Sequence, residues 1–350
     1  MLVSSQLSEV PAVERLVNIW AARYCPDLSV LSVGSDPVVR HQLREAASEN
    51  GRVQIAHKLD ERLIKEKCVL AAIRTKELLA HCKALDLVEA GRLADSASRV
   101  YRKLLEVYQE SSSVVAMPSK RRLWETFGDA SLVTWGMPQI EKLAYGLEPL
   151  LLELQEQYLV SKDWRSLSFI TTQINFSNAL LREQLTPVER VLMNPYLKFV
   201  EEQVALPWQR VCAAAAKHSP DSPIFMVVEQ NLPMASEIST AIYYQLRGFF
   251  PNHSSRRGGL DNPGVKHSCL RDLDMFQAYL WLCTLEKSLK FVEQELLAMC
   301  IMVFESLGIL WKMTTKANEL LMHEILERLE FHQKSLINPY TKGMVEAFPA

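Results

Sequence analysis

The sequence predicts an all-α protein, and three observations carry this prediction. Only 12 of the 350 residues are glycine. Apolar residues recur at three- and four-residue steps over long stretches, which is typical of amphipathic helices. Alternating β patterns are absent, apart from short apolar pieces near Val30 and Phe225. With 48% hydrophobic and 23% charged residues, the chain has the balance of a globular protein, and its length suggests about two or three domains.

The expected helices follow one another along the chain. Residues 53–83 and 87–109 each place their leucines, isoleucines or valines on one side and their charges elsewhere. Two further helices are expected over residues 138–160 and 163–184. A fresh helix start is predicted at Thr186-Pro187-Val188-Glu189, because threonine is a good N-cap and proline is favoured at the first helical position.

One segment breaks the helical pattern and suggests a domain boundary. Residues 110–122 contain serines, a proline and a basic cluster, which is typical of a linker. We therefore predict a helical N-terminal unit over residues 1–115, a linker with connecting helices over 116–185, and a C-terminal helical domain over 186–350.

Charge and cysteine usage limit the possible partners and compartments. A net charge of −2 gives no field that would recruit nucleic acid or an anionic membrane. The seven cysteines form an odd set without a C-x-x-C pair, which favours a reducing compartment over a disulfide framework or a zinc ribbon. The first residues do not resemble a signal peptide, and no apolar run is long enough to span a bilayer. We expect a cytoplasmic protein that neither binds nucleic acid nor inserts into a membrane.

The common catalytic motifs are missing from the sequence. It contains no phosphate-binding loop, dinucleotide fingerprint, zinc-protease motif or acyl-transfer motif. Carboxylates one helical turn apart lack the Glu-x-x-His of a di-iron site, and we expect them on solvated faces. These carboxylates are Glu153, Glu156, Glu324, Glu327 and Glu330. An enzyme is therefore the less favoured interpretation, and we assign no catalytic or metal-ligating residue.

The most suggestive chemistry lies in Cys269-Leu270-Arg271-Asp272. A loop rich in glycine, asparagine and proline precedes it, and we expect Ser268 to cap the helix that follows. Cys269 and Asp272 then share one face of the first turn. A helix N-terminus at this point would lower the pKa of the Cys269 thiol and favour its thiolate.

Asp272 begins a stripe that continues through Phe276, Tyr279 and Cys283 at steps of four, three and four residues. Burying an unpaired carboxylate on this stripe would be costly, so Asp272 needs a cation or an N–H donor. The partner is either a ligand that presents N–H groups or a protein cation. The candidate cations are Arg247, Lys266 and Arg271.

The order of residues in this region resembles that of the phycobiliproteins, the globin-like light-harvesting subunits of cyanobacteria and red algae. The shared order is a helix ending in two aromatic residues, then proline, Gly-Gly and asparagine, and then Cys269-x-Arg271-Asp272 with Tyr279 seven residues after the aspartate. The stretch from Leu185 onward is about one family domain long, and Leu307-Gly308 is similar to the end of a later helix in the family.

The resemblance implies a globin-like C-terminal domain and a linear tetrapyrrole (bilin) as cofactor. It implies a thioether from Cys269 to the bilin and an ion pair between Arg271 and a propionate. Asp272 would accept hydrogen bonds from pyrrole N–H groups, and Arg–carboxylate pairing of this kind is physically favourable. The implied partners are proteins of the photosynthetic antenna, at the periphery of the thylakoid membrane.

Three functions remain open at this point. The first is a non-enzymatic phycobiliprotein-like protein, with or without bilin, that acts in antenna assembly or regulation. The second is a helical protein-interaction module that has lost its pigment. The third is a helical enzyme acting on tetrapyrroles. For Cys269 itself, a buried thiol in a core helix and a metal ligand beside His253 and His267 are the alternatives.

Overall fold

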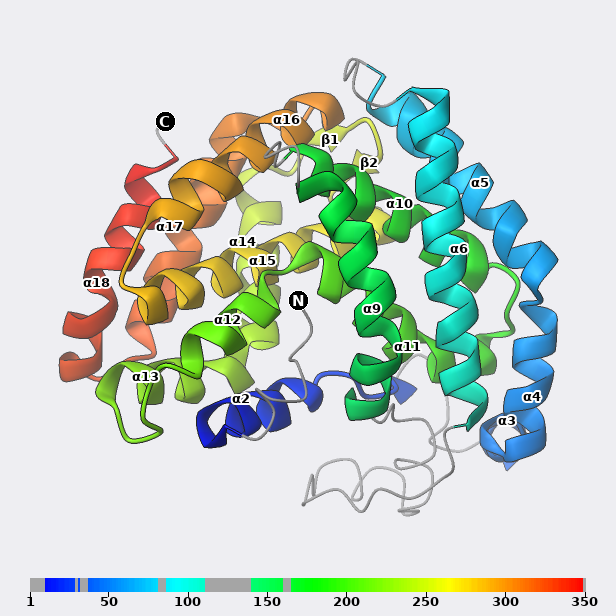
Figure 1. The fold of residues 1–350 in the computed structure, drawn as a ribbon. Coiled ribbons are helices and arrows are strands. Elements are labelled where there is room, and N and C mark those ends of the chain that lie inside the picture. The colour runs from blue at the N-terminus through cyan, green and yellow to red at the C-terminus, as the bar shows by residue number, and fades with distance from the viewer. Residues whose placement is uncertain are drawn as a thin grey trace. The chain divides into compact units, whose positions relative to one another are not determined.

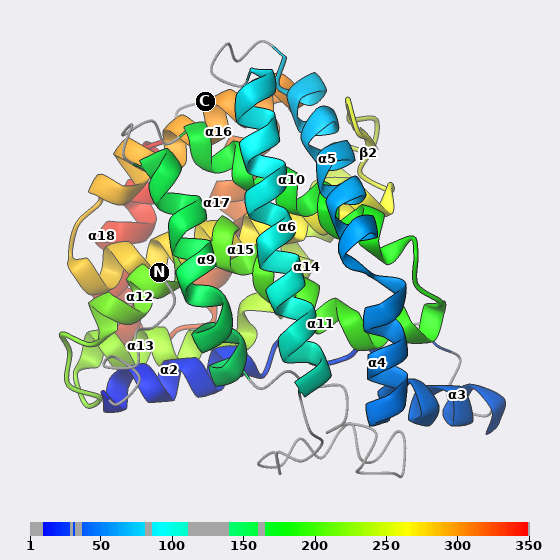
Figure 2. The same cartoon turned by 45° about the vertical axis from the view of Figure 1, so that its right-hand side comes forward.

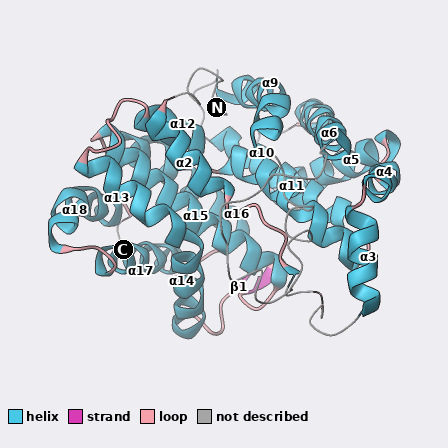
Figure 3. Ribbon diagram, turned by 90° about the horizontal axis from the view of Figure 1, so that it is seen from below, coloured by secondary structure: helices cyan, strands magenta, loops and turns pink. Residues whose placement is uncertain are grey.

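The chain is helical throughout the part that the structure describes, which is residues 10–28, 31, 37–80, 86–110, 140–159 and 165–348 of a computed structural model. In these ranges the strands are limited to one short antiparallel hairpin, β1 (Ser254–Ser255) with β2 (Gly258–Gly259) (Figure 1, Figure 3). The all-α prediction is confirmed. No described helix combines the length and the apolar character that crossing a bilayer requires.

The chain forms two compact units. The N-terminal unit comprises Ala21–Glu156 and Phe169–Glu201, and the C-terminal unit comprises Met1–Trp20, Gln157–Ser168 and Glu202–Ala350. These ranges differ from the predicted division at 1–115, 116–185 and 186–350, because residues 1–20 belong to the C-terminal unit and residues 186–201 to the N-terminal one. Residues 111–122, most of the predicted linker, lie outside the described residues.

The N-terminal unit contains a helical hairpin, in which α5 and α6 lie side by side (Figure 2). Its helices are α3 (Pro37–Ala47), α4 (Glu49–Lys58), α5 (Glu61–Leu78), α6 (Leu87–Glu110) and most of α9 (Ile140–Leu159), α10 (Arg165–Arg182) and α11 (Pro187–Ala205). The single helix expected over residues 53–83 is thus two helices. Asp60 causes the break, since its side chain accepts a hydrogen bond from the Leu63 amide at 2.7 Å and caps α5.

The predicted helix start at Thr186 is confirmed, and it has the geometry of a capping box. The Glu189 amide donates to Oγ1 of Thr186 at 3.3 Å, and the Thr186 amide donates to Oε2 of Glu189 at 2.9 Å. Two backbone donors that the helix leaves unsatisfied are therefore paired reciprocally. Pro187 occupies the first position of α11, where no amide hydrogen is needed.

The C-terminal unit is built around α15 (Pro263–Glu286), which packs against α12, α13, α14, α17 and α18. From Leu273 to Leu285 almost every residue of α15 is buried, as expected for a helix surrounded by other helices. The other elements of this unit are α2 (Pro11–Ala21), α12 (Trp208–Ala215), α13 (Pro223–Asn231), η2 (Leu232–Met234), α14 (Ala235–Phe249), η3 (Val292–Leu296), α16 (Leu297–Leu307), α17 (Trp311–Glu327) and α18 (Phe331–Glu346).

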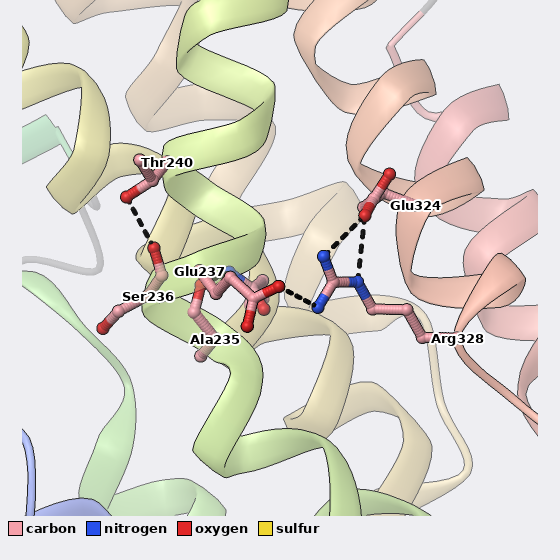
Figure 4. Close-up of polar contacts among 7 residues, drawn as sticks. Ala235, Ser236, Glu237, Thr240, Glu324 and Arg328 are labelled. Atoms are coloured by element: carbon pink, nitrogen blue, oxygen red, sulfur yellow. Dashed lines mark hydrogen bonds and ion pairs between the residues drawn. The ribbon is translucent and has the colours of Figure 1, made fainter. Parts of the chain in front are cut away.

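An arginine joins α14 to the end of α17 (Figure 4). Arg328 donates to Oε1 of Glu237 at 2.9 Å and to Oε1 of Glu324 at 2.9 Å. Glu153 is held in the same manner by both terminal nitrogens of Arg99, at 2.6 and 2.9 Å. The predicted solvated positions hold for Glu327 and Glu330, which are exposed, and in part for Glu153 and Glu324, which are partly exposed. The Glu156 side chain lies outside the described residues.

Candidate functional site

The helix that carries the candidate residues begins earlier than expected. Asn262, not Ser268, is its N-cap: the Asn262 side chain accepts from the amides of Gly264 at 2.8 Å and Val265 at 3.3 Å, and Pro263 takes the first helical position. The predicted cap at Ser268 is wrong. Asn262 and Pro263 were assigned to the loop, but asparagine followed by proline is also a signal for the start of a helix. Oγ of Ser268 instead accepts a hydrogen bond from Arg257 at 3.2 Å.

Cys269 therefore lies on the second turn of α15, away from the unpaired amides at the helix start. Its side chain is partly buried. Burial raises the pKa of the Cys269 thiol to about 12, the Asp272 carboxylate adds to this effect, and Arg271 opposes it. The expected lowering of this pKa is wrong, because desolvation of the thiolate outweighs the helix dipole. Cys269 is consequently protonated at neutral pH.

The partner of Asp272 is its neighbour Arg271. The arginine donates from Nη2 at 2.6 Å and from Nε at 3.1 Å, both to Oδ1 of Asp272. The other two candidate cations lie elsewhere: Arg247 pairs with Asp261, and Lys266 lies over the rings of Tyr243 and Tyr244. Within the described residues, no donor reaches Oδ2 of Asp272, so one oxygen of the carboxylate retains its full capacity to accept hydrogen bonds.

The pair lies where α15 emerges from the core. The side chains of Arg271 and Asp272 are 15% and 23% exposed, whereas Phe276, Tyr279 and Cys283 of the same stripe are buried. Residues 265–272 are all partly buried. The stripe thus faces the interior as predicted, but its carboxylate stands at the exposed end. The structure places Cys269, Arg271 and Asp272 together on one partly accessible segment of helix.

A metal centre at this position has no support from the geometry. Among the residues that the structure describes, no three histidine, cysteine, aspartate or glutamate side chains come close enough together to hold a metal ion. His253 is partly buried, and this burial lowers the pKa of its imidazole. The described residues therefore do not support the alternative in which His253, His267 and Cys269 share a metal.

A buried polar network beside the site escaped the sequence analysis. Asp274 is only 7% exposed and accepts a hydrogen bond from Oγ of Ser239 at 2.6 Å. Gln277 donates to the same Oγ at 2.9 Å and to the Ala235 carbonyl at 3.0 Å. The signal was present in the sequence, because Asp274 and Gln277 are polar residues three positions apart within an otherwise apolar run.

A second buried group lies on the other side of α15. Glu295, whose side chain is 7% exposed, receives both terminal nitrogens of Arg210, at 2.5 and 2.9 Å. Tyr279 lies 3.5 Å from Oε2 of Glu295. Glu295 belongs to η3, a single π-helical turn, and π-helical turns occur often at functional positions. No motif in the sequence distinguishes this pair, because its two residues are 85 positions apart.

No family model matches the chain, and no curated protein or solved structure is significantly similar to it. The fold and the site together define an all-α protein with a partly exposed Cys-x-Arg-Asp segment on a central helix. The resemblance to phycobiliproteins, the globin-like description of the C-terminal half and the roles of Cys269, Arg271 and Asp272 stay predictions.

Proposed function

We propose that the C-terminal unit is a non-enzymatic, phycobiliprotein-like module that binds a linear tetrapyrrole along residues 265–272 of α15. The carrying observation is the Arg271–Asp272 pair. It is partly accessible, and only one of its two carboxylate oxygens is paired with the arginine. Oδ2 of Asp272 suits the N–H groups of pyrroles, and the guanidinium suits a propionate.

The state of Cys269 supports binding without a spontaneous covalent bond. The thiolate is the nucleophilic form of cysteine, and burial raises the pKa of this thiol to about 12. Very little thiolate is present at neutral pH. The bilin is therefore held by its polar groups, and it dissociates when the protein is denatured.

The wider role that goes with this proposal is in a photosynthetic antenna, in its assembly or its regulation. The partners would be antenna proteins at the periphery of the thylakoid membrane. This part of the proposal follows from the resemblance, whereas the position and accessibility of the Arg271–Asp272 pair support the ligand site itself.

Co-expression with bilin synthesis, followed by an absorption spectrum of the purified protein, tests the proposal. We expect visible absorbance that Asp272→Asn shifts or removes and that Asp261→Asn leaves unchanged. Asp261 is a suitable control because its side chain is 79% exposed and pairs with Arg247 outside the site. Without bilin, Asp272→Asn should cost about 1–2 kcal/mol, well below the roughly 3–5 kcal/mol of a fully buried pair, because this ion pair is partly solvated.

Three results would count against the proposal. They are a colourless wild-type protein, an unchanged spectrum in Asp272→Asn, and a large loss of stability in ligand-free Asp272→Asn. The last would mean that the carboxylate is a structural partner of Arg271. Pigment that stays attached after denaturation would contradict only the non-covalent mode of binding.

A pigment-free interaction module is the second candidate, and two exposed aromatic residues favour it. Tyr244 and Phe249 of α14 are 51% and 58% exposed, and each has a lysine over its ring, Lys266 and Lys316 respectively. Aromatic residues are enriched at protein interfaces. On this alternative, Phe249→Ala abolishes co-sedimentation with purified antenna complexes while the fold is unaffected and the protein stays colourless.

A further inference from the structure

An arginine without a charged partner is buried in the N-terminal unit. Arg52 of α4 is only 4% exposed. Among the residues that the structure describes, none forms an ion pair or a side-chain hydrogen bond with it, and its Nε has no acceptor. Arginine cannot shed its charge by losing a proton. Only Nε of Arg52 is a buried atom without an acceptor, but a guanidinium with so little contact with water is still costly unless an anion accompanies it.

The helix α6 packs against α4 and supplies a hydrogen-bond donor, but no counter-charge, on Tyr108. The hydroxyl of Tyr108, in α6, is also buried and unpartnered, and the whole residue is 2% exposed. Burial and the neighbouring Tyr196 raise the pKa of this phenol, and Arg52 lies near enough to act in the opposite direction. The ring of Tyr196 stands edge-on to that of Tyr108, with centroids 4.9 Å apart, which fixes the direction of the phenol.

A carboxylate that acts on Tyr108 is already neutralised. Glu189 acts on Tyr108, but it is paired with Lys58 at 2.5 Å and accepts the Thr186 amide at 2.9 Å. Lys58 and Glu189 cancel each other, so the charge of Arg52 remains. Nε of Arg52 and the hydroxyl of Tyr108, on two helices that pack against each other, are thus both buried without acceptors.

We propose that Arg52 and Tyr108 form a binding site for a small oxyanion, a carboxylate or a phosphate group. The planar guanidinium can donate two parallel hydrogen bonds to either group, and charge-assisted bonds of this kind are the strong ones. The phenol supplies a third donor. The bound anion neutralises the charge that the surrounding protein leaves, and it satisfies the orphaned Nε and hydroxyl together. This site is independent of the proposed bilin site in the other unit.

The test is thermal unfolding of the full chain in chloride buffers of constant ionic strength, with inorganic phosphate or acetate added. One of the two anions should raise the melting temperature of the wild type in a saturable manner, by on the order of 5 °C at 100 times its dissociation constant. Which of them does so separates a phosphate site from a carboxylate site. Arg52→Gln should lose the response. Arg62→Gln, which removes an exposed arginine of α5, should keep it.

Two further variants keep the proposal falsifiable if Arg52→Gln does not fold. Arg52→Lys retains the charge but loses the fork, so its response should weaken. Tyr108→Phe removes a hydroxyl that has no partner, so it should be at least as stable as the wild type without anion, and yet bind the anion roughly tenfold more weakly. A wild type that responds to neither anion overturns the proposal. So does an equal response in the Arg52 or Tyr108 variants, because the anion would then bind elsewhere.

Discussion

Replacing Glu295 with glutamine tests how much the buried ion pair beside α15 stabilises the C-terminal unit. The substitution keeps the shape of the side chain and removes its charge. It leaves Arg210 with one neutral acceptor in place of a bidentate carboxylate. Arg210 also lies over the ring of Phe291, at 4.7 Å from its centroid, and that contact is unaffected.

The expected loss in free energy of unfolding lies between two known limits, and the exposure of the pair decides where it falls between them. Breaking a fully buried ion pair costs about 3–5 kcal/mol, and an exposed pair contributes about 0–1 kcal/mol. The side chain of Glu295 is 7% exposed, but that of Arg210 is 34% exposed, so water stabilises part of the abandoned charge. We therefore expect a loss of about 2 kcal/mol, which corresponds to a fall in melting temperature of about 4–8 °C.

Denaturant unfolding and thermal unfolding of the purified variant measure this loss. Glu286→Gln is the matched control. It removes the carboxylate that pairs with Lys217, whose side chain is 64% exposed, and it should cost less than about 1 kcal/mol. Replacing both Arg210 and Glu295 with apolar residues should recover most of the loss. If Glu295→Gln costs no more than Glu286→Gln, burial does not strengthen this pair and the reasoning fails.

Three other substitutions have outcomes that the backbone and the burial determine. Gly51→Ala should destabilise the protein by about 1–3 kcal/mol, since a Cβ there would lie 2.6 Å from the Ala46 carbonyl oxygen. Gly91→Ala, with open space around it, should stabilise the protein by about 0.5–1 kcal/mol. Denaturant unfolding that ranks the two variants the other way would refute the packing around these glycines. Lys287→Gly should stabilise by about 1 kcal/mol, because Lys287 ends α15 with φ of +51°; an unchanged unfolding midpoint would contradict this. Burial lowers the pKa of His253 from its ordinary 6.5, so the unfolded chain binds the proton more tightly and stability falls as the pH drops through 6.5. His253→Gln should therefore make the free energy of unfolding depend less on pH between pH 8 and 5. An equally steep dependence in the variant would refute the assignment.

Much of the helical layout could be predicted because it depends on local physics. Apolar spacing located α6, α9 and α10 to within about two residues, and the start of α11 was recognised from the side-chain chemistry of its cap at Thr186. The errors were also local. Asp60 caps a helix within a continuous apolar pattern, and Asn262 caps a helix within a segment that also has the composition of a loop. Sequence spacing alone does not decide between a cap and the alternative at such positions.

Some properties of the candidate site could not be predicted from neighbouring residues in the sequence. The positions of Cys269, Arg271 and Asp272 on one helix followed from their spacing. The pKa of Cys269 did not, because the desolvation of a thiol depends on what surrounds it. For Asp272, the spacing left open whether the partner is a ligand, Arg247, Lys266 or Arg271; the structure pairs it with Arg271 and leaves it partly exposed.

The amino-acid sequence by itself determined the all-α class, the spacing of the helices and the placing of three polar residues on one helical segment, because each of these depends on groups within a few positions of one another. Only the tertiary structure decided which charges are buried. Arg210 and Glu295, 85 positions apart, form an ion pair because separate helices pack together, and Arg52 is buried because α4 packs against α6. The free energy of a charge depends on the water and the partners around it, and packing alone determines both.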